Sequence, residues 1–163
     1  MVNLQNFAAA MAFGICTSVL TGAAVSAQAP EVYEFQNLSS HLLGNSGTEL
    51  GAPDGETRAQ WVLKTPAGAA PEVYQIQLKG TNWCIKAESK SYAHLVDCAA
   101  NPGKPQRWKL NPAEGQPTTI ASRMYPGHVL TTGGAEDQNV TLEPRDPSKY
   151  DGQQEWYPYR QDR

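Results

Sequence analysis

Residues 106–110 read Gln-Arg-Trp-Lys-Leu, and segments of the same kind recur along the chain at nearly equal spacing. Trp61 precedes Trp108 by 47 residues, and Trp156 follows it by 48 residues. The Gln-x-Trp order of residues 106–108 is repeated at Trp156 but not at Trp61. A fixed period of this length indicates a chain built from repeated supersecondary units.

Short segments of alternating apolar residues, separated by Gly, Pro, Asn and Asp turns, fill each repeat and predict β-strands. No window of eleven or more residues within 30–163 shows a convincing apolar stripe of helical period. Three units of four strands favour a closed barrel, which has no exposed sheet edges, whereas a propeller normally needs at least four units. We therefore predict an all-β protein, a β-trefoil with pseudo-three-fold symmetry. Besides a strand at each repeated tryptophan, the predicted strands lie near 32–35, 41–43, 48–50, 73–78, 83–87, 94–98, 118–121, 128–131 and 140–142.

Length and charge limit the possible function classes. The chain has 163 residues, of which 16 are acidic and 13 are basic, so the formal net charge is −3. This length suits one domain, alone or with a processed segment. The charge is too small and of the wrong sign for a nucleic-acid binder or for a protein that binds anionic membranes.

The first 29 residues contain no Asp, Glu, Lys, Arg or His, and 7–20 is an apolar stretch rich in small residues. Two small-x-small patterns, at 25–27 and 27–29, follow this stretch. We interpret 1–29 as a secretory signal peptide and 30–163 as one secreted, extracellular domain, without membrane insertion after processing. The alternative is a transmembrane anchor, for which the interrupted apolar run is short against a hydrocarbon core of about 30 Å.

Secretion would change the number of cysteines in the mature chain from three to two, because Cys16 would be removed with the signal peptide. Cys84 and Cys98 would remain as an even pair in an oxidising compartment, where a disulfide is expected. The alternative is two free buried thiols. No metal is expected, since two cysteines and three scattered histidines show no ligand-pair spacing.

Two sequons mark possible glycosylation sites in a secreted chain. They are Asn37-Leu38-Ser39 and Asn139-Val140-Thr141. Because such triplets also arise by chance, each asparagine is only a candidate acceptor.

The middle repeat resembles a known family. Its Cys84-Ile85, Val96-Asp97-Cys98 and Gln106–Leu110 segments are similar to one repeat of the ricin B-type lectins, a β-trefoil family with a Gln-x-Trp signature in each repeat. The resemblance implies a disulfide within the second lobe. It also implies that the signature residues are structural, with the tryptophans packed near the pseudo-three-fold axis and the glutamines hydrogen-bonded to backbone. The residues concerned are Trp61, Gln106, Trp108, Gln154 and Trp156.

The sugar sites of that family place an Asp two residues after the first Cys, an aromatic residue two before the next Cys, and an amide three before the Trp. In the middle repeat these positions hold Lys86, Val96 and Pro105. Lys accepts no hydrogen bond and Val offers no ring for stacking, so this site is lost. In the first repeat Arg58 occupies the amide position.

The third repeat is the least altered, because it retains Gln153 in the amide position. We therefore predict a rearranged ligand site in that repeat. Its candidate residues are Thr131, Asp137, Gln138, Tyr150 and Gln153. The alternative interpretation is that these residues lie in solvated loops. Likewise, Trp83 and Tyr92 either form an exposed stacking platform or cover the outside of the barrel.

Catalysis finds no support in the sequence. The three histidines lie in different repeats, and neither a Gly-x-Ser-x-Gly nor a His-Glu-x-x-His motif is present. We therefore expect no enzyme activity and no cofactor. The leading hypothesis is a secreted, lectin-like protein that binds a glycan or glycoprotein. The rival hypothesis is a β-trefoil that binds or inhibits another protein without sugar.

Overall fold

The computed structural model describes residues 30–52, 59–133 and 138–161, and within these ranges it confirms the all-β fold. The predicted signal peptide, 1–29, lies outside the described residues. Twelve strands are present in the described part, four in each repeat. They are β1 Val32–Gln36, β2 Gly44–Ser46, β3 Glu49–Gly51, β4 Trp61–Lys64, β5 Val73–Leu78, β6 Trp83–Ala87, β7 Ala93–Asp97, β8 Trp108–Lys109, β9 Ala121–Ser122, β10 His128–Thr132, β11 Val140–Pro144 and β12 Tyr157–Arg160.

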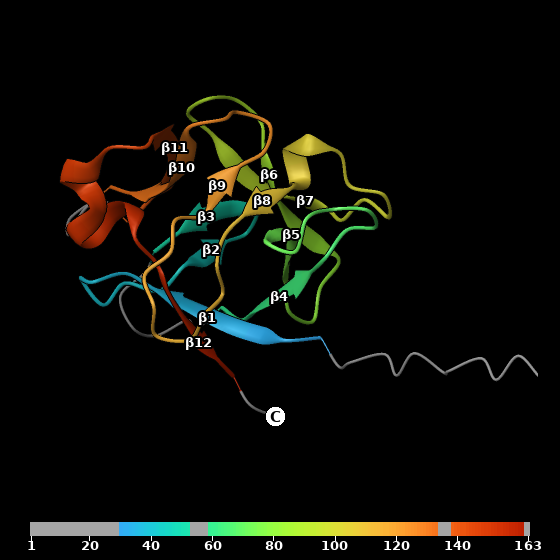
Figure 1. Cartoon of the computed structure of the whole chain (residues 1–163), viewed down its shortest axis with the longest axis horizontal. Helices are drawn as coiled ribbons and strands as arrows, with labels where there is room; N and C mark the ends of the chain where they lie inside the picture. Colours follow the sequence, from blue (N-terminus) through green and yellow to red (C-terminus); the bar gives the residue numbers. More distant parts are fainter. Residues whose placement is uncertain (1–29, 53–58, 134–137, 162–163) are drawn as a thin grey trace, which may run out of the picture.

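The first and last strands of the repeats form a barrel (Figure 1). Strand β1 pairs with β4 and β12, β4 with β5, β5 with β8, and β8 with β9, all antiparallel. A bridge between Thr118 and Trp156 joins the beginning and the end of the third repeat. The ring is thereby closed, as expected for a β-trefoil.

The middle strands of each repeat form hairpins, β2–β3, β6–β7 and β10–β11, and these hairpins meet one another. Glu49 of β3 pairs with His94 of β7, and Gly51 bridges to Asn139 just before β11. Segments from the first and third repeats therefore lie side by side, far apart in sequence.

Three short helical turns complete the described structure: η1 Lys104–Gln106, η2 Pro147–Lys149 and the π-helical η3 Tyr150–Gln154. Two strand predictions were displaced. Strand β2 begins at Gly44 rather than at His41, because Leu42 and Leu43 are buried and their backbone pairs with the end of β1 instead of with β3. In the third repeat, β9 begins at Ala121, and Thr118 contributes only its bridge.

The three repeated tryptophans occupy equivalent places in the core. Trp61, Trp108 and Trp156 are each 0% exposed. Their indole Nε1 atoms donate to the carbonyls of Leu43, Ile85 and Leu130, at 2.9, 2.9 and 3.1 Å respectively. In each repeat the acceptor lies in the second strand or directly before it, so every buried indole N–H is satisfied in the same way. The predicted core role of these tryptophans is confirmed.

The two signature glutamines also have equivalent partners. Gln106 Nε2 donates to the Asp97 carbonyl at 2.8 Å, and its Oε1 accepts from the Ala99 N–H at 2.9 Å. Gln154 Nε2 donates to the Pro144 carbonyl at 3.0 Å, and its Oε1 accepts from the Asp146 N–H at 2.8 Å. Both amides therefore fasten the chain that leaves the third strand of the repeat, which confirms their predicted backbone contacts.

Cys84 and Cys98 are joined by a disulfide, with a Cα–Cα distance of 4.9 Å. The bond connects β6 to the residue that follows β7, so it closes the hairpin of the second repeat. The prediction of a bridge is confirmed, and the alternative of free thiols is wrong.

Candidate functional site

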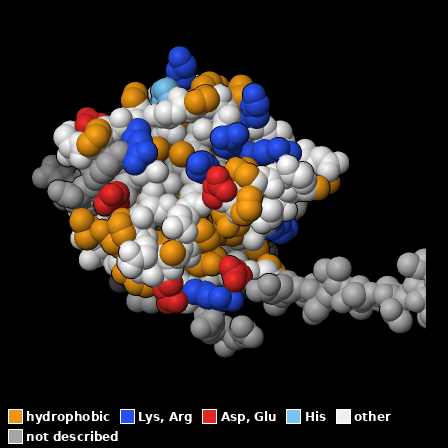
Figure 2. Space-filling model, in the orientation of Figure 1, with side chains coloured by type: hydrophobic (Ala, Val, Ile, Leu, Met, Phe, Trp, Pro, Cys, Tyr) orange, Lys and Arg blue, Asp and Glu red, His pale blue; other side chains and the backbone are white. Residues whose placement is uncertain are grey.

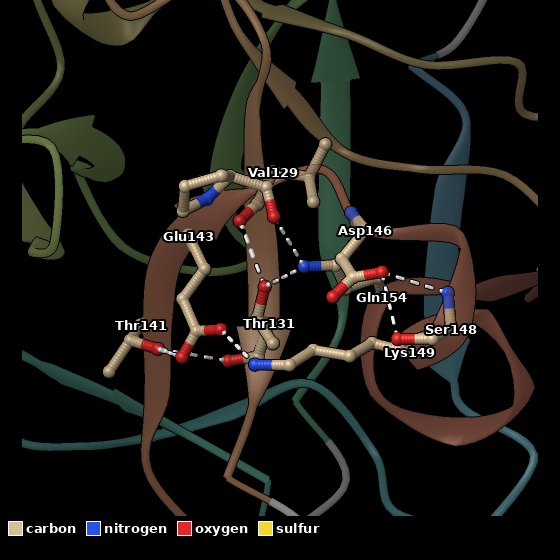
Figure 3. Close-up of polar contacts among 9 residues, drawn as sticks. Val129, Thr131, Thr141, Glu143, Asp146, Ser148, Lys149 and Gln154 are labelled. Atoms are coloured by element: carbon tan, nitrogen blue, oxygen red, sulfur yellow. Dashed lines mark hydrogen bonds and ion pairs between the residues drawn. The ribbon is translucent and has the colours of Figure 1, made fainter.

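Of the residues predicted to form a site in the third repeat, Thr131 belongs to an internal hydrogen-bond network (Figure 3). Thr131 is 1% exposed. Its hydroxyl donates to the Val129 carbonyl at 3.2 Å and accepts from Gln154 Nε2 at 3.1 Å. Because this hydroxyl is buried and bonded within the protein, it is not presented to a ligand. The prediction that Thr131 contacts a ligand is corrected accordingly.

The charged side chains beside this network are bonded within the protein. Lys149 Nζ lies 2.7 Å from Glu143 Oε2, and this hydrogen bond raises the pKa of Lys149. Asp146 Oδ1 accepts from the backbone N–H and the hydroxyl of Ser148 at 2.9 and 2.8 Å, which lowers the pKa of Asp146. Figure 3 shows these side chains directed at one another, so they hold the η2–η3 turn in place.

The other candidate residues do not gather around Thr131. Gln153 is half-buried on η3, while Gln138 is exposed and lines a different cleft. Asp137 lies outside the described residues, as does the side chain of Tyr150. The residues predicted from the sequence therefore do not form one site, and Gln138 lines a hollow in the described surface.

That hollow is a cleft of about 410 Å³ between the β2–β3 hairpin and the segment that enters β11. Its volume lies within the usual range for small-ligand sites, about 300–1,000 Å³. Gly47, with a φ of +59°, forms the tight turn that carries the hairpin. The Ala52 N–H donates to the Gln138 carbonyl at 2.6 Å and holds the two sides together. The lining residues are Asn45, Ser46, Glu49, Leu50, Gly51, Gln138 and Asn139.

One carboxylate in this cleft is fixed in position by a neighbouring hairpin. Tyr92 directly precedes β7, and its hydroxyl lies 2.8 and 2.9 Å from the two carboxylate oxygens of Glu49. This hydrogen bond is the main cause of the raised pKa of Tyr92. A carboxylate has about four lone-pair sites, so Glu49 retains acceptor capacity after it binds one hydroxyl.

Tyr92 and Trp83 do not form a joint stacking platform. Trp83 pairs with Asp97 at one end of the β6–β7 hairpin, and Tyr92 stands at the turn, beyond the last pair of Ala87 with Ala93. Four residues of strand separate the two ends by about 13 Å. Both rings are partly exposed, at 36% for Trp83 and 37% for Tyr92, and each covers a different part of the surface.

The replaced sugar position of the middle repeat is occupied by an internal ion pair. Lys86 Nζ contacts Glu88 Oε2, and this contact lowers the pKa of Glu88. His94 Nε2 lies 3.5 Å from the same carboxylate oxygen. A ligand hydroxyl would meet a paired ammonium group at this position instead of a carboxylate acceptor.

The two sequon asparagines differ in solvent exposure. Asn37 is 3% exposed, and its Nδ2, the atom that would carry a glycan, donates to the Gly152 carbonyl at 2.8 Å. Because this nitrogen is buried and directed at Gly152 and Thr132, we expect Asn37 to carry no glycan in the folded chain. Asn139 is exposed and lines the cleft. Its glycosylation stays a prediction.

The described surface shows neither a metal cluster nor a membrane span. Within 30–52, 59–133 and 138–161, no three His, Cys, Asp or Glu side chains come together as metal ligands. In the same ranges no helix is both long and apolar enough to traverse a bilayer. Figure 2 shows acidic and basic side chains interspersed with hydrophobic ones on the face it displays.

Comparison with known proteins identifies the fold. No protein-family model and no curated protein matches the chain. Among solved structures, it is similar to the designed 3-fold symmetric protein ThreeFoil, with 17% identity and a TM-score of 0.56 over 78% of this chain and 97% of that one. The fold is a β-trefoil.

Two larger proteins contain a similar domain. A mosquitocidal holotoxin has 12% identity and a TM-score of 0.64, over 82% of this chain and 17% of the toxin. An endo-β-galactosidase from Clostridium perfringens that releases GlcNAcα1-4Gal has 14% identity and a TM-score of 0.65, over 81% of this chain and 33% of that one. The β-trefoil thus spans a small part of each of these proteins, and the likeness concerns the fold alone.

Proposed function

We propose that this β-trefoil is a secreted, non-enzymatic, lectin-like protein that binds a glycan or glycoprotein in the cleft between the β2–β3 hairpin and Asn139. The observation that carries the proposal is the fixed Glu49 carboxylate in a polar cleft of about 410 Å³. The similarity of the middle repeat to ricin B-type lectins supports the same class of function.

The cleft has the chemistry that a sugar ring requires. Glu49 accepts hydrogen bonds from ligand hydroxyls. The Asn45 amide, whose Nδ2 donates to the Gly47 carbonyl at 2.9 Å, has its oxygen and its second N–H left for a ligand. Leu50 also lines the cleft, although it belongs to the core and is 4% exposed. A few directed polar groups over an apolar patch are typical of sites that select a small polar ligand.

Charge narrows the class of sugar. Glu49 is the one charged residue among the described residues that line the cleft. A carboxylate without a neighbouring cation disfavours sialic acids, uronic acids and sulfated sugars. We therefore propose a neutral glycan as the ligand of this cleft.

The test is a glycan array followed by calorimetric titration of the best ligand. The protein should come from a host that adds no N-glycans, since a glycan on Asn139 would lie at the cleft. Glu49→Gln retains the shape of the side chain and removes its charge, and Tyr92→Phe removes only the hydroxyl that holds the carboxylate. Glu72→Gln is the matched control, because Glu72 faces Lys109 beside β8 and is not among the cleft residues.

We expect Glu49→Gln to weaken binding about tenfold or more, because a hydrogen bond to a charged group is lost. Tyr92→Phe should weaken it less, and Glu72→Gln should leave it unchanged. Binding that survives Glu49→Gln at full strength would show that the ligand sits elsewhere. Absence of binding to every glycan, together with capture of a protein partner, would instead support the protein-binding rival.

A further inference from the structure

Two arginines stand directly opposite each other at the end of the β8–β9 strand pair. Trp108 pairs with Ser122 in this antiparallel ladder. One step further on, the Arg123 N–H donates to the Arg107 carbonyl at 3.0 Å. Because Trp108 and Ser122 are buried, the residues next to them project from the outer face of the two strands. Arg107 and Arg123 therefore lie side by side on the surface, Arg107 half-buried and Arg123 exposed.

Further positive charge lies around this pair. Lys109 projects from the same face of β8 as Arg107, and Lys104 begins η1, three residues before Arg107. Both lysines are exposed. The Glu72 carboxylate lies 3.5 Å from Lys109 Nζ. A hydrogen bond from its own backbone is the main cause of the lowered pKa of Glu72, and the charges of Lys109 and Arg123 lower it further.

Lys104, Arg107, Lys109 and Arg123 together form a basic surface. Figure 2 shows several Lys and Arg side chains near one another over the region that carries η1 and β8 in Figure 1. The excess of positive charge is local, because the chain as a whole has a formal net charge of −3.

The two guanidinium groups differ in how the protein holds them. Arg107 Nε donates to the Pro102 carbonyl at 2.7 Å, which restrains the guanidinium group and leaves the N–H groups of both Nη atoms for a ligand. The side chain of Arg123 makes no hydrogen bond or ion pair to the parts of the chain that the structure describes. Like charges directly opposite each other in a sheet are destabilising. The arrangement is therefore unfavourable in the free chain and becomes favourable when an anion lies between the two groups.

We propose that the basic surface binds a short acidic segment of a partner protein, whose Asp or Glu carboxylates lie across Arg107 and Arg123. A guanidinium group binds a carboxylate through two parallel N–H···O bonds, and a restrained guanidinium group loses little freedom when it does so. Met124 follows Arg123 in the same turn and is 40% exposed. Its flexible thioether side chain adds an apolar contact beside the charges.

Long polyanions fit this surface less well than a short acidic segment. Nucleic acids and anionic membranes gain affinity from many phosphate contacts along an extended surface. The basic surface is small, and the net charge of −3 opposes the approach of a long polyanion. A short run of carboxylates needs only these few cations and also uses the apolar contact at Met124.

The test is fluorescence anisotropy of a labelled peptide of glutamates around one leucine, titrated with the protein. A peptide with glutamine in place of every glutamate carries the same label and serves as the uncharged comparison. The variants are Arg107→Gln, Arg107→Lys and Arg123→Gln. Lys79→Gln is the matched control, because Lys79 follows β5 at the end opposite to Val73, the residue that pairs with Lys109.

We expect the glutamate peptide to bind and the glutamine peptide to give no measurable binding. Arg107→Gln and Arg123→Gln should each weaken binding about tenfold, since a hydrogen bond between charged groups is lost, whereas Lys79→Gln should not change it. Arg107→Lys retains the charge but not the paired donors, so its affinity should lie between those of the unmodified protein and Arg107→Gln. A rise in salt from about 0.1 M to about 1 M, which shortens the Debye length from about 10 Å to about 3 Å, should also weaken binding.

Arg123→Gln decides the outcome if Arg107→Gln fails to fold, because the Arg123 side chain is exposed and its replacement should not lower the urea midpoint. The inference is overturned if the glutamine peptide binds as tightly as the glutamate peptide, or if Arg123→Gln binds at full strength. It is also overturned if heparin oligosaccharides or single-stranded DNA bind through Arg123 and the acidic peptide does not. Glu49→Gln should leave peptide binding unchanged, because none of the residues of the basic surface lines the cleft at Glu49. Failure of the glycan site and failure of this inference are therefore separate results.

Discussion

Replacement of Trp108 by alanine tests the central packing argument. The indole is 0% exposed, and its Nε1 donates to the Ile85 carbonyl at 2.9 Å. Loss of the buried ring costs about 3–5 kcal/mol in transfer free energy and cavity formation. The Ile85 carbonyl also loses its indole donor, which places the expected loss of unfolding free energy at the upper end of this range. Typical domains have about 5–15 kcal/mol in total, so the variant should be close to unfolding.

The measurement is urea denaturation with the disulfide intact, followed by circular dichroism, with the midpoint and the slope reported separately. Trp108→Phe retains much of the apolar volume but removes the donor, and should cost about 1–3 kcal/mol. Trp83→Ala is the control, because Trp83 is 36% exposed, and should cost about 1–2 kcal/mol. A near-neutral Trp108→Ala, or a Trp83→Ala that costs as much, would refute the assignment of Trp108 to the barrel core.

Three further predictions follow from other contacts. Replacement of both Cys84 and Cys98 by serine should lower the unfolding free energy by about 3 kcal/mol, since the bond closes a short loop; an unchanged urea midpoint would contradict this. Glu49→Gln should lower the pKa of Tyr92 towards its ordinary 10.0, as measured by tyrosinate absorbance, because the raised pKa comes mainly from the bond to Glu49. Since that pKa is raised in the folded state, the stabilising contribution of Tyr92 is present below pH 10 and is lost as the pH rises through the folded value. This contribution should be smaller in the variant, where desolvation and Glu88 are the remaining causes. Asn37→Ala should cost about 1–3 kcal/mol, because the Asn37 side chain is buried and hydrogen-bonded; mass mapping of protein from a glycosylating host should find Asn37 unmodified, and a glycan there would contradict the buried contact.

The repeats could be predicted from sequence because each one satisfies the same physical requirement. A buried indole N–H needs an acceptor, and in the second and third repeats a glutamine amide also holds the chain that leaves the hairpin. The Trp61 indole has its carbonyl acceptor although no glutamine stands two residues before it. The spacing of the tryptophans therefore predicted the repeats better than the complete Gln-x-Trp signature did. The position of β2 was missed because Leu42 and Leu43 are apolar and read as strand, although they pack inward just before the hairpin begins.

The candidate site was harder to predict because it is made by contacts between repeats. Gln138 was a candidate, but as part of the third repeat alone. Its partners Asn45 and Glu49 come from the first repeat, and Tyr92, which positions Glu49, comes from the second. No spacing within one repeat carries that information. It depends on the pairing of β3 with β7 and on the bridge from Gly51 to Asn139.

The polar groups that preserve the fold and those that are free to bind a ligand are therefore different groups. Gln154 and Thr131 are buried, and their hydrogen bonds are made to each other and to backbone, so a ligand that used them would have to break bonds that hold the third repeat. Glu49 is exposed and outside this framework, and it does not belong to the repeated signature. Changes at such positions alter recognition with little effect on the barrel. It follows that absence of the sugar-binding residues of ricin B-type lectins from the repeats does not by itself imply absence of sugar binding, since the binding groups proposed for this chain are located where the repeats differ.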